Sequence, residues 1–423
     1  MTTFGSCSTI LIMKKPLLAL FLLANTLLQA QDKPLTLQEA VKSGINRNPE
    51  LRELYSVLDQ KRNAARQETG IADPEVSYFR EGISNGPGDI FDEQRVTVSQ
   101  TIDFPLTTAY RIKGIREEVS ALENELKARE KMVRAEIKSN YVEVIYALRL
   151  QRSRQNQVNI LTDLHKAVST KLELGMASGI DLASVELQLQ EALNDLDQSE
   201  FILHKARYNL FYAMGMPVPE QKYSITFSDS LSASEVEVDQ ILTLALLEQQ
   251  PEFQSTIHEL QAARLFLKEA KSNVLPDLRL NLYRQDYGSG YDFTGFEVGV
   301  SIPLWYPLAH KGKINASTAR VAEVGWKQDR IRLELKRELE HAWHNYDISR
   351  KIINRYRDTM RSRATELQRL SLRAYQLGEI DLLMLLNARQ VFLNGEQHYL
   401  AAMRDYYLQL IALERYLGQD LVQ

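Results

Sequence analysis

The sequence predicts a mainly α-helical protein with an internal tandem repeat and four β-strands per chain, each strand long enough to cross a membrane as part of a β-barrel. Three observations predict this class. Prolines and glycines recur at a near-constant offset, two long proline-free spans carry apolar residues at coiled-coil spacing, and short segments alternate apolar and polar residues. The 423 residues are 25% charged and 44% hydrophobic with a formal net charge of −4, which argues for a folded chain and against a nucleic-acid-binding protein.

The N-terminus has the pattern of a secretory signal peptide. Two lysines after Met13 precede a short apolar run that ends at Ala30, so we expect residues 1–30 to be removed on export and translation to start at Met13. The only cysteine, Cys7, lies before that run, and the mature chain therefore has no site for a disulfide or an acyl anchor. No later segment reaches the ~18 apolar residues of a membrane helix, which leaves strands or the surface as the route into a membrane.

Landmark residues recur at one offset and indicate a duplication. Three pairs of prolines are 202 residues apart, namely Pro49 and Pro251, Pro74 and Pro276, and Pro105 and Pro307. Two pairs of glycines are 203 residues apart, namely Gly175 and Gly378, and Gly215 and Gly418. We predict a first repeat over residues 31–215, a linker over residues 216–236 and a second repeat over residues 237–423. Each repeat should contain, in order, a helix, two strands, a long helix, a tip turn and a returning helix.

The second strand of each repeat shows the clearest alternation. Residues 95–104 and 296–304 each place apolar side chains on one face and mostly polar ones on the other. Nine or ten residues is also the length that a strand needs to cross an outer membrane. We expect the following side chains to face lipid: Val96, Val98, Ile102, Phe296, Val298, Val300 and Ile302. The alternative is a soluble four-stranded sheet packed under helices.

The long helices favour the membrane interpretation. No proline occurs from Leu106 to Met216, or from Leu308 to the end of the chain. Apolar residues follow one seam at coiled-coil spacing in each span; in the second, that seam is Leu339, Ala342, Tyr346, Ile353, Tyr356, Met360, Leu367 and Ala374. An unbroken helix from Thr107 to Leu174 would be about 100 Å long. One compact soluble domain does not hold such helices, so they must pack side by side into a bundle or a tube.

Four strands cannot close a barrel, because membrane-spanning barrels start at about eight strands. Open sheet edges are not tolerated in lipid. The chain must therefore form oligomers. Two copies would give eight strands around a filled interior, and three copies would give twelve strands around a lumen.

The turns between the long helices carry the most specific motifs. The segments LELGMASGIDLASVELQ and YQLGEIDLLMLLNARQ, together with the opening LTLQEAVKSGINRNPEL, resemble the TolC family of outer-membrane efflux proteins. The resemblance covers nearly the whole mature chain. It implies a homotrimer whose twelve strands form a β-barrel in the outer membrane of a Gram-negative bacterium, continued by an α-helical coiled-coil tunnel in the periplasm.

The resemblance also implies a function. The protein would be the passive exit duct of a tripartite efflux system, with a periplasmic adaptor protein and an inner-membrane pump, expected to be of the RND type, as partners. Such a duct is not an enzyme and needs no cofactor. Multidrug export and type I secretion are alternative uses of the same duct, and a periplasmic coiled-coil scaffold without a pore is the alternative from a different class.

Site residues follow from the family motifs. The resemblance implies that the adaptor docks on the tips at Leu174, Gly175, Leu377 and Gly378. It implies a periplasmic gate or constriction at Asp181, Tyr375, Glu379 and Asp381. The simpler interpretation is that the glycines end helices and the aspartates cap the next ones. We also predict a shortened second turn, GEID, in which Glu379 stands where some family members carry arginine.

The cargo is the least determined feature. The compact second tip and the short C-terminus resemble the heavy-metal (CzcC/CusC-like) branch, which makes metal cations one expected cargo. His341 and His344 lie three residues apart and form a candidate metal contact. Because no third ligand is near them in the sequence, we predict that they are solvated helix surface rather than a metal site.

Overall fold

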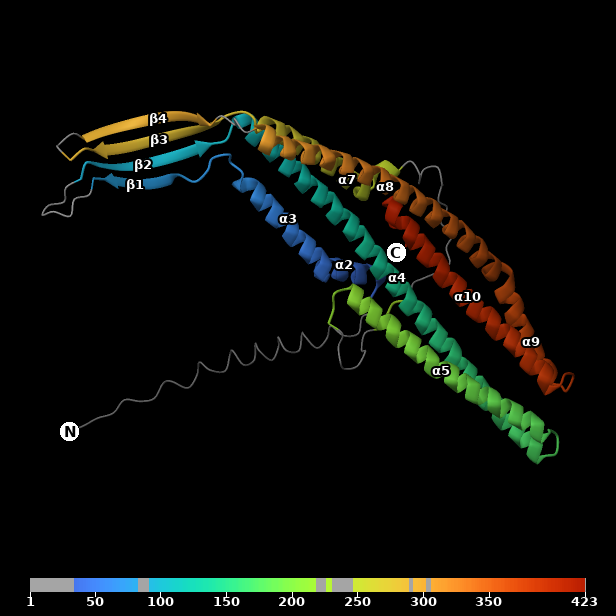
Figure 1. The fold of residues 1–423 in the computed structure, drawn as a ribbon. Coiled ribbons are helices and arrows are strands. Elements are labelled where there is room, and N and C mark those ends of the chain that lie inside the picture. The colour runs from blue at the N-terminus through green and yellow to red at the C-terminus, as the bar shows by residue number, and fades with distance from the viewer. Residues whose placement is uncertain are drawn as a thin grey trace, which may run out of the picture.

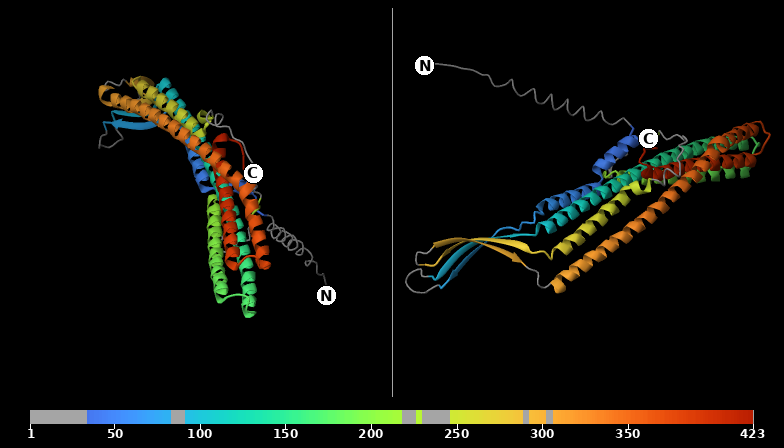
Figure 2. Two further views of the ribbon diagram at one scale, coloured as in Figure 1. Left: turned by 90° about the vertical axis from the view of Figure 1, so that its right-hand side faces the viewer. Right: turned by 90° about the horizontal axis from the view of Figure 1, so that it is seen from above.

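The computed structural model describes residues 34–82, 91–217, 226–229, 246–288, 292–301 and 306–422. The molecule is elongated, with a β-sheet at one end and two helical hairpin tips at the other (Figure 1, Figure 2). The predicted signal peptide and most of the predicted linker lie outside the described residues. Within the described part, no helix is both long enough and apolar enough to cross a membrane.

The order of elements is the same in both halves of the chain. The first half contains α2 (Leu37–Arg47), α3 (Pro49–Gln67), β1 (Glu75–Glu81), β2 (Glu93–Ile102), α4 (Pro105–Glu173) and α5 (Gly179–Ala213). The second half contains η1 (Leu247–Gln249), α7 (Pro251–Ser272), β3 (Asp277–Asp286), β4 (Asp292–Ser301), α8 (Tyr306–Arg355), the π-helical turn η2 (Tyr356–Met360), α9 (Arg361–Gln376) and α10 (Leu382–Leu417).

The first predicted helix is in fact two helices, because the chain breaks at Asn48. Pro49 occupies the first position of α3, where its missing N–H costs nothing. The Asn48 side chain accepts hydrogen bonds from the backbone N–H of Glu50 at 3.0 Å and of Leu51 at 3.3 Å, which caps α3. Its Nδ2 donates to the carbonyl of Ala213 at 3.2 Å and so ties the break to the end of α5.

The four strands form one antiparallel sheet in the order β1-β2-β3-β4. β2 starts and ends two residues earlier than the predicted 95–104. It ends because the next two backbone N–H groups leave the ladder: that of Asp103 donates to Gly70 O at 2.9 Å, and that of Phe104 donates to Asp277 Oδ1 at 3.1 Å. The end of the predicted strand 296–304, including Ile302, lies outside the described residues.

The offset of 202 also appears in the pairing of the strands. Glu75 of β1 lies opposite Ser99 of β2, and Asp277 of β3 lies opposite Ser301 of β4. Both positions of the second pair equal those of the first plus 202, so the two hairpins share one register. β1 and β4 are the two edges of the sheet within the chain.

The long helices pack around one apolar cluster below the sheet. Ile137, Tyr141 and Val144 of α4 are buried there, as the coiled-coil spacing predicts. They share this cluster with buried residues of α8 and α10, among them Tyr346 and Tyr406. The Tyr141 hydroxyl lies 2.8 Å from the carbonyl oxygens of both Leu35 and Ser228.

The π-helical turn explains why the offset changes from 202 to 203. Buried seam positions match at an offset of 202 up to Tyr346, the equivalent of Val144, but Val168 matches buried Ser371 at an offset of 203. One extra residue has therefore entered the second long helix between these points. The turn η2 lies there, and a π-helical turn holds one residue more than an α-helical turn.

This extra residue makes part of the predicted seam wrong. Met360 and Leu367 were expected to point inward but are exposed, and Ser371 is buried instead. A pattern extended past an inserted residue stays one position out of register, which is about 100° around the helix.

Candidate functional site: two helical tips and an exposed strand face

The first tip is a Schellman turn followed by a capped helix. Gly175 adopts a φ of 70°, which favours glycine. Its N–H donates to Leu172 O at 2.9 Å, and the N–H of Met176 donates to Lys171 O at 2.7 Å, so the last carbonyls of α4 are satisfied. α5 then begins after Ser178, which acts as its N-cap.

The second tip repeats this geometry. Gly378 has a φ of 75°, its N–H donates to Tyr375 O at 3.2 Å, and the N–H of Glu379 donates to Ala374 O at 2.9 Å. α10 then begins after Asp381, whose carboxylate accepts a hydrogen bond from the N–H of Met384 at 2.8 Å. The two connections, residues 174–178 and 377–381, are each five residues long, so the second turn is not shorter than the first.

The two aspartates are not equivalent. Asp381 is an N-cap and corresponds to Ser178, whereas Asp181 lies three positions into α5 and corresponds to Met384. Both tips contain the sequence Ile-Asp-Leu, but an alignment on this sequence pairs Asp181 with Asp381 and is three residues away from the structural match. The offset of 203 between the glycines links Ser178 with Asp381, and this signal was available in the sequence.

Both carboxylates cap helices. The Oδ2 of Asp181 accepts hydrogen bonds from the Ser178 N–H at 2.9 Å and the Ser178 hydroxyl at 2.8 Å. The backbone bond and then the hydroxyl bond hold the pKa of Asp181 below its usual value, so this carboxylate is ionised at neutral pH. Asp381 and Glu379 are both exposed beside the second tip. A role for Asp181 or Asp381 at a constriction would come in addition to its role in helix capping.

The tips expose leucines in matching places. Leu174 is 68% exposed and Leu377 is 65% exposed. Behind them, a separate apolar cluster that includes Val168, Val185 and Leu386 holds the two hairpins together. The tips are therefore supported from within and leave apolar side chains uncovered at their ends, a feature typical of interaction surfaces.

A contact between the hairpins lies next to the tips. The ammonium of Lys171 on α4 is 4.3 Å from the centroid of the Tyr375 ring on α9, a cation–π distance. Tyr375 thus lies at the junction of the two hairpins. Nothing in the sequence indicates Lys171, because the contact depends on two helices that are about two hundred residues apart becoming neighbours.

A groove of about 410 Å³ lies between α4, α9 and α10, with Leu385 and Arg389 of α10 among its lining residues. Arg389 is buried, and its Nη2 donates to Gln157 O at 3.0 Å. Burial lowers the pKa of its guanidinium to about 10. The sequence did not single out this residue, since an arginine on a helix is usually solvated.

At the other end of the molecule, one face of the sheet is apolar and exposed. The registers place even-numbered residues of all four strands on this face. Its exposed apolar members are Val76, Tyr78, Val96, Val98, Leu280, Leu282, Phe296, Val298 and Val300. Ile102 lies on the same face and is half-buried. A face of this kind, with Phe296 80% exposed, is not expected of a sheet in water.

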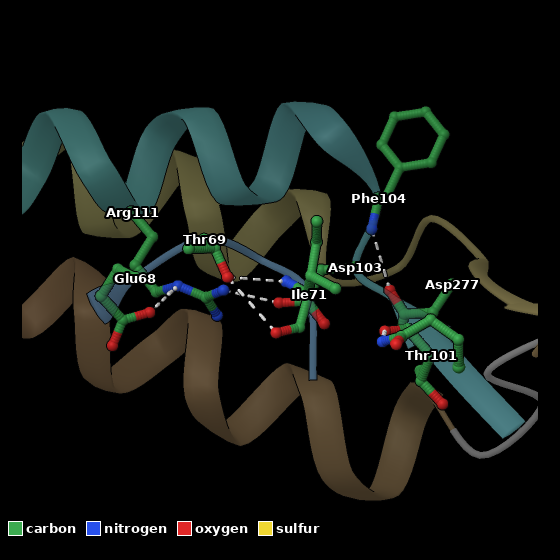
Figure 3. Close-up of polar contacts among 9 residues, drawn as sticks. Glu68, Thr69, Ile71, Thr101, Asp103, Phe104, Arg111 and Asp277 are labelled. Carbon is green, nitrogen blue, oxygen red and sulfur yellow. Dashed lines mark hydrogen bonds and ion pairs between the residues drawn. The ribbon is translucent and has the colours of Figure 1, made fainter. Parts of the chain in front are cut away.

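A polar joint connects the sheet to the helices (Figure 3). Arg111 near the start of α4 contacts Glu68 at 2.9 Å and Asp103 at 2.5 Å, and so links the end of α3 to the end of β2. The bond from the Phe104 N–H to Asp277 joins the first hairpin to the second. These contacts set the direction in which the strands leave the helical part.

The two histidines that the sequence raised as a metal contact lie exposed on α8. Among the described residues, no group of three or more histidine, cysteine or acidic side chains is placed to hold a metal ion. The geometry of His341 and His344 therefore gives no support to a metal site.

Residues 242–419 match the family model described as Outer membrane efflux protein. Among solved structures, the Campylobacter jejuni CmeC outer membrane channel shares 14% identity and a TM-score of 0.78, over 90% of this chain and 85% of its own. The open-state Neisseria gonorrhoeae MtrE outer membrane channel shares 17% identity and a TM-score of 0.74, over 91% and 89%. CusC shares 14% identity and a TM-score of 0.75, over 90% and 91%.

No curated protein matches the sequence. The second half of the chain thus matches an outer membrane efflux protein domain, and the chain as a whole shares the fold of these solved channel structures. The predicted combination of long helices with four antiparallel strands is confirmed by this fold.

Proposed function

We propose that the protein is the outer-membrane exit duct of a tripartite efflux system. One observation carries the proposal: a strand face of nine exposed apolar side chains at the end of the molecule opposite the helical tips. Lipid is the environment that makes such a face stable. The alternative from a different class, a periplasmic scaffold without a pore, does not explain why this strand face is apolar and exposed.

The duct is a homotrimer. Three copies supply twelve strands, which is enough for a barrel with an open lumen, and the long helices continue it as a tunnel in the periplasm. The open edges at β1 and β4 support an oligomer, because edges are not tolerated in lipid. The duct is passive, and no residue is assigned a catalytic role.

The tips are the docking site for a periplasmic adaptor that connects the duct to an inner-membrane pump, expected to be of the RND type. The exposed Leu174 and Leu377, presented by the turns at Gly175 and Gly378, support this. The groove beside them offers a neighbouring surface in which a partner helix could lie.

The same end contains the periplasmic gate. Asp181, Glu379 and Asp381 would each occur three times around the axis of a trimer, and rings of carboxylates favour cations over anions. Tyr375 would stabilise the closed arrangement through its contact with Lys171.

Heavy-metal cations are one cargo class, with drugs and secreted proteins as the others. The acidic residues at the tips support cations, but the second turn, at five residues, is no more compact than the first. The cargo test is a deletion strain challenged with Cu, Co, Zn, Cd and a drug panel. Sensitivity to drugs alone would contradict the metal cargo while leaving the duct in place.

The duct itself is tested by fractionation. The protein should stay with outer membranes after a salt wash and enter solution only with detergent, as a trimer by light scattering. Recovery as a salt-soluble monomer would contradict the proposal. Cells that lack the protein should regain export when the intact gene is returned.

A further inference from the structure

A buried arginine near the helical tips has no acidic partner among the described residues. Arg389 of α10 is only 7% exposed, whereas Lys138 and Glu414, the other charged side chains buried in that part of the chain, pair with each other. The hydrogen bond that Arg389 donates there runs from its Nη2 to the carbonyl oxygen of Gln157 at 3.0 Å. A carbonyl has no net charge, and a guanidinium has five N–H donors. This cation can therefore still bind an anion.

Arg389 lines a groove whose walls are otherwise mostly apolar. The groove has a volume of about 410 Å³ and lies between α4, α9 and α10. Its apolar and aromatic lining residues are Ile160, Leu164, Ala167, Leu372, Tyr375 and Leu385. Ile160 is 42% exposed and Leu372 is 44% exposed, so apolar surface faces solvent beside a buried charge. Both features cost free energy, and a ligand with an apolar chain and a negative charge offsets both.

The charges around the groove favour an anion with a single negative charge. Arg389 is the cationic side chain among the lining residues, and Asp163 of α4 lines the groove as well. Asp163 is exposed and would repel a second negative charge on the ligand. A phosphate group with two charges is therefore disfavoured. A carboxylate fits better, because it accepts two parallel hydrogen bonds from the fork of a guanidinium.

We propose that this groove binds a long-chain carboxylate, with the carboxylate on Arg389 and the apolar chain against Ile160, Leu164 and Leu372. The site is a feature of the chain itself and does not depend on the proposed function. A helix with its side chains is about 10–12 Å wide, so a partner helix over the groove reaches inside with side chains only. A flexible acyl chain can follow the groove as far as the buried guanidinium.

A ligand in the groove joins the two helical hairpins. Arg389 belongs to the second hairpin, whereas Ile160 and Leu164 belong to α4 of the first. Tyr375 also lines the groove, and its ring contacts Lys171 of α4. The bound carboxylate therefore adds contacts that are lost when the hairpins separate. In the proposed duct these contacts stabilise the closed arrangement of the tips, and this consequence rests on the proposed function.

Photolabelling tests the site in the full chain, held in lipid nanodiscs. The probe is dodecanoate with a diazirine at the end of its chain, and light should attach it to the peptides that contain Ile160, Leu164 and Leu372. Unlabelled dodecanoate should prevent this labelling. Dodecanol and dodecylamine have the same chain but no negative charge, so each should need about tenfold higher concentrations. Equal competition by all three compounds would overturn the proposal, because it would show partition onto an apolar surface only.

Two variants separate the charge of the groove from its shape. Arg389→Met removes the cation, and Ala167→Trp fills the groove from an exposed position while Arg389 stays in place. Each should reduce the labelling about tenfold at the same probe concentration. The matched control Arg363→Met changes an exposed arginine of α9 and should be labelled like the parent. Thermal midpoints show which variants are folded, and Ala167→Trp decides the matter if Arg389→Met is not. Labelling of the folded variants at the level of the parent would overturn the site.

The consequence for the duct has its own measurement. In single-channel recordings, dodecanoate should lower the open probability of the parent and of Arg363→Met, but not that of Ala167→Trp. An equal effect on all three would overturn the role in the duct, because it would come from the surrounding lipid. A parent chain recovered as a salt-soluble monomer would instead overturn the proposed function, and photolabelling of that soluble chain would still decide the binding site.

Discussion

Lys138 of α4 and Glu414 of α10 form a buried ion pair that also holds the end of the chain. The ammonium lies 2.5 Å from Glu414 Oε1 and 2.9 Å from both Asp420 Oδ1 and the Val422 carbonyl. The other oxygen of Glu414 accepts hydrogen bonds from the N–H groups of Leu421 and Val422, each at 3.0 Å. The residues after α10 are therefore held against α4 by a network that uses all three lysine donors.

Replacement of Lys138 should destabilise the helical part strongly. Lys138→Met leaves Glu414 buried without its cation, and breaking such a pair costs about 3–5 kcal/mol. The measurement is the denaturant midpoint of the purified protein in detergent. The control is Lys166→Met on the exposed side of the same helix. Equal midpoints for the two variants would contradict the role of the network.

Acid should weaken this attachment. The hydrogen bond from Lys138 is the main cause that lowers the pKa of Asp420, so Asp420 binds a proton more readily in the unfolded chain. Its contribution to stability is complete above its ordinary pKa of about 4 and is lost as the pH falls through the lowered folded value. The difference in thermal midpoint between the parent and Asp420→Asn should shrink below about pH 4. A difference independent of pH would contradict this assignment.

Polar replacements at the tips should abolish export without loss of stability. Leu174→Asn and Leu377→Asn change side chains that are about two-thirds exposed, so the core is not affected. If these leucines contact the adaptor, the double variant should behave like the deletion strain in an export assay. Leu333→Asn, an equally exposed leucine on α8, should export normally. An unchanged thermal midpoint shows that the fold is intact.

Two variants of Asp381 separate capping from gating. Asparagine is as good an N-cap as aspartate but carries no charge, whereas alanine removes both and costs about 1 kcal/mol. If the carboxylate acts in a gate, Asp381→Asn and Asp381→Ala should both reduce cation selectivity in single-channel recordings. If it only caps α10, Asp381→Asn should match the parent and only Asp381→Ala should lower stability.

Deletion of one residue from the π-helical turn should be tolerated. Removing Thr359 converts η2 into a regular α-helical turn and restores the offset of 202, so the helices on both sides keep their packing. Removing Gln155 from the regular helix α4 rotates all following seam residues by about 100° and should prevent assembly. The yield of detergent-extracted trimer measures both. Similar yields would show that the turn does not hold an extra residue.

The sequence could predict features that depend on local patterns. The length of α4 follows from a span without proline, and the exposed strand face follows from alternation with period two. Breaks in these patterns were harder to predict. Asn48 ends one helix and begins another without interrupting the apolar spacing, so one helix was expected where two exist.

Other features could not be predicted because they depend on contacts between distant segments. The network at Lys138 and the contact of Lys171 with Tyr375 join helices that are remote in sequence. The wrong match of the two aspartates has a different cause. Serine and aspartate are equally good N-cap residues, so the two tips can have the same structure with different residues at the N-cap position.

The matched tips have a consequence for any assembly that meets the tunnel. Ser178 and Asp381 occupy the same structural position, as do Met176 and Glu379, so one turn is neutral there and the other is acidic. In the proposed trimer, a partner that senses only backbone shape encounters six alike positions around the ring. A partner that senses charge encounters two alternating sets of three, and it can therefore bind in only half of the orientations that shape alone would allow.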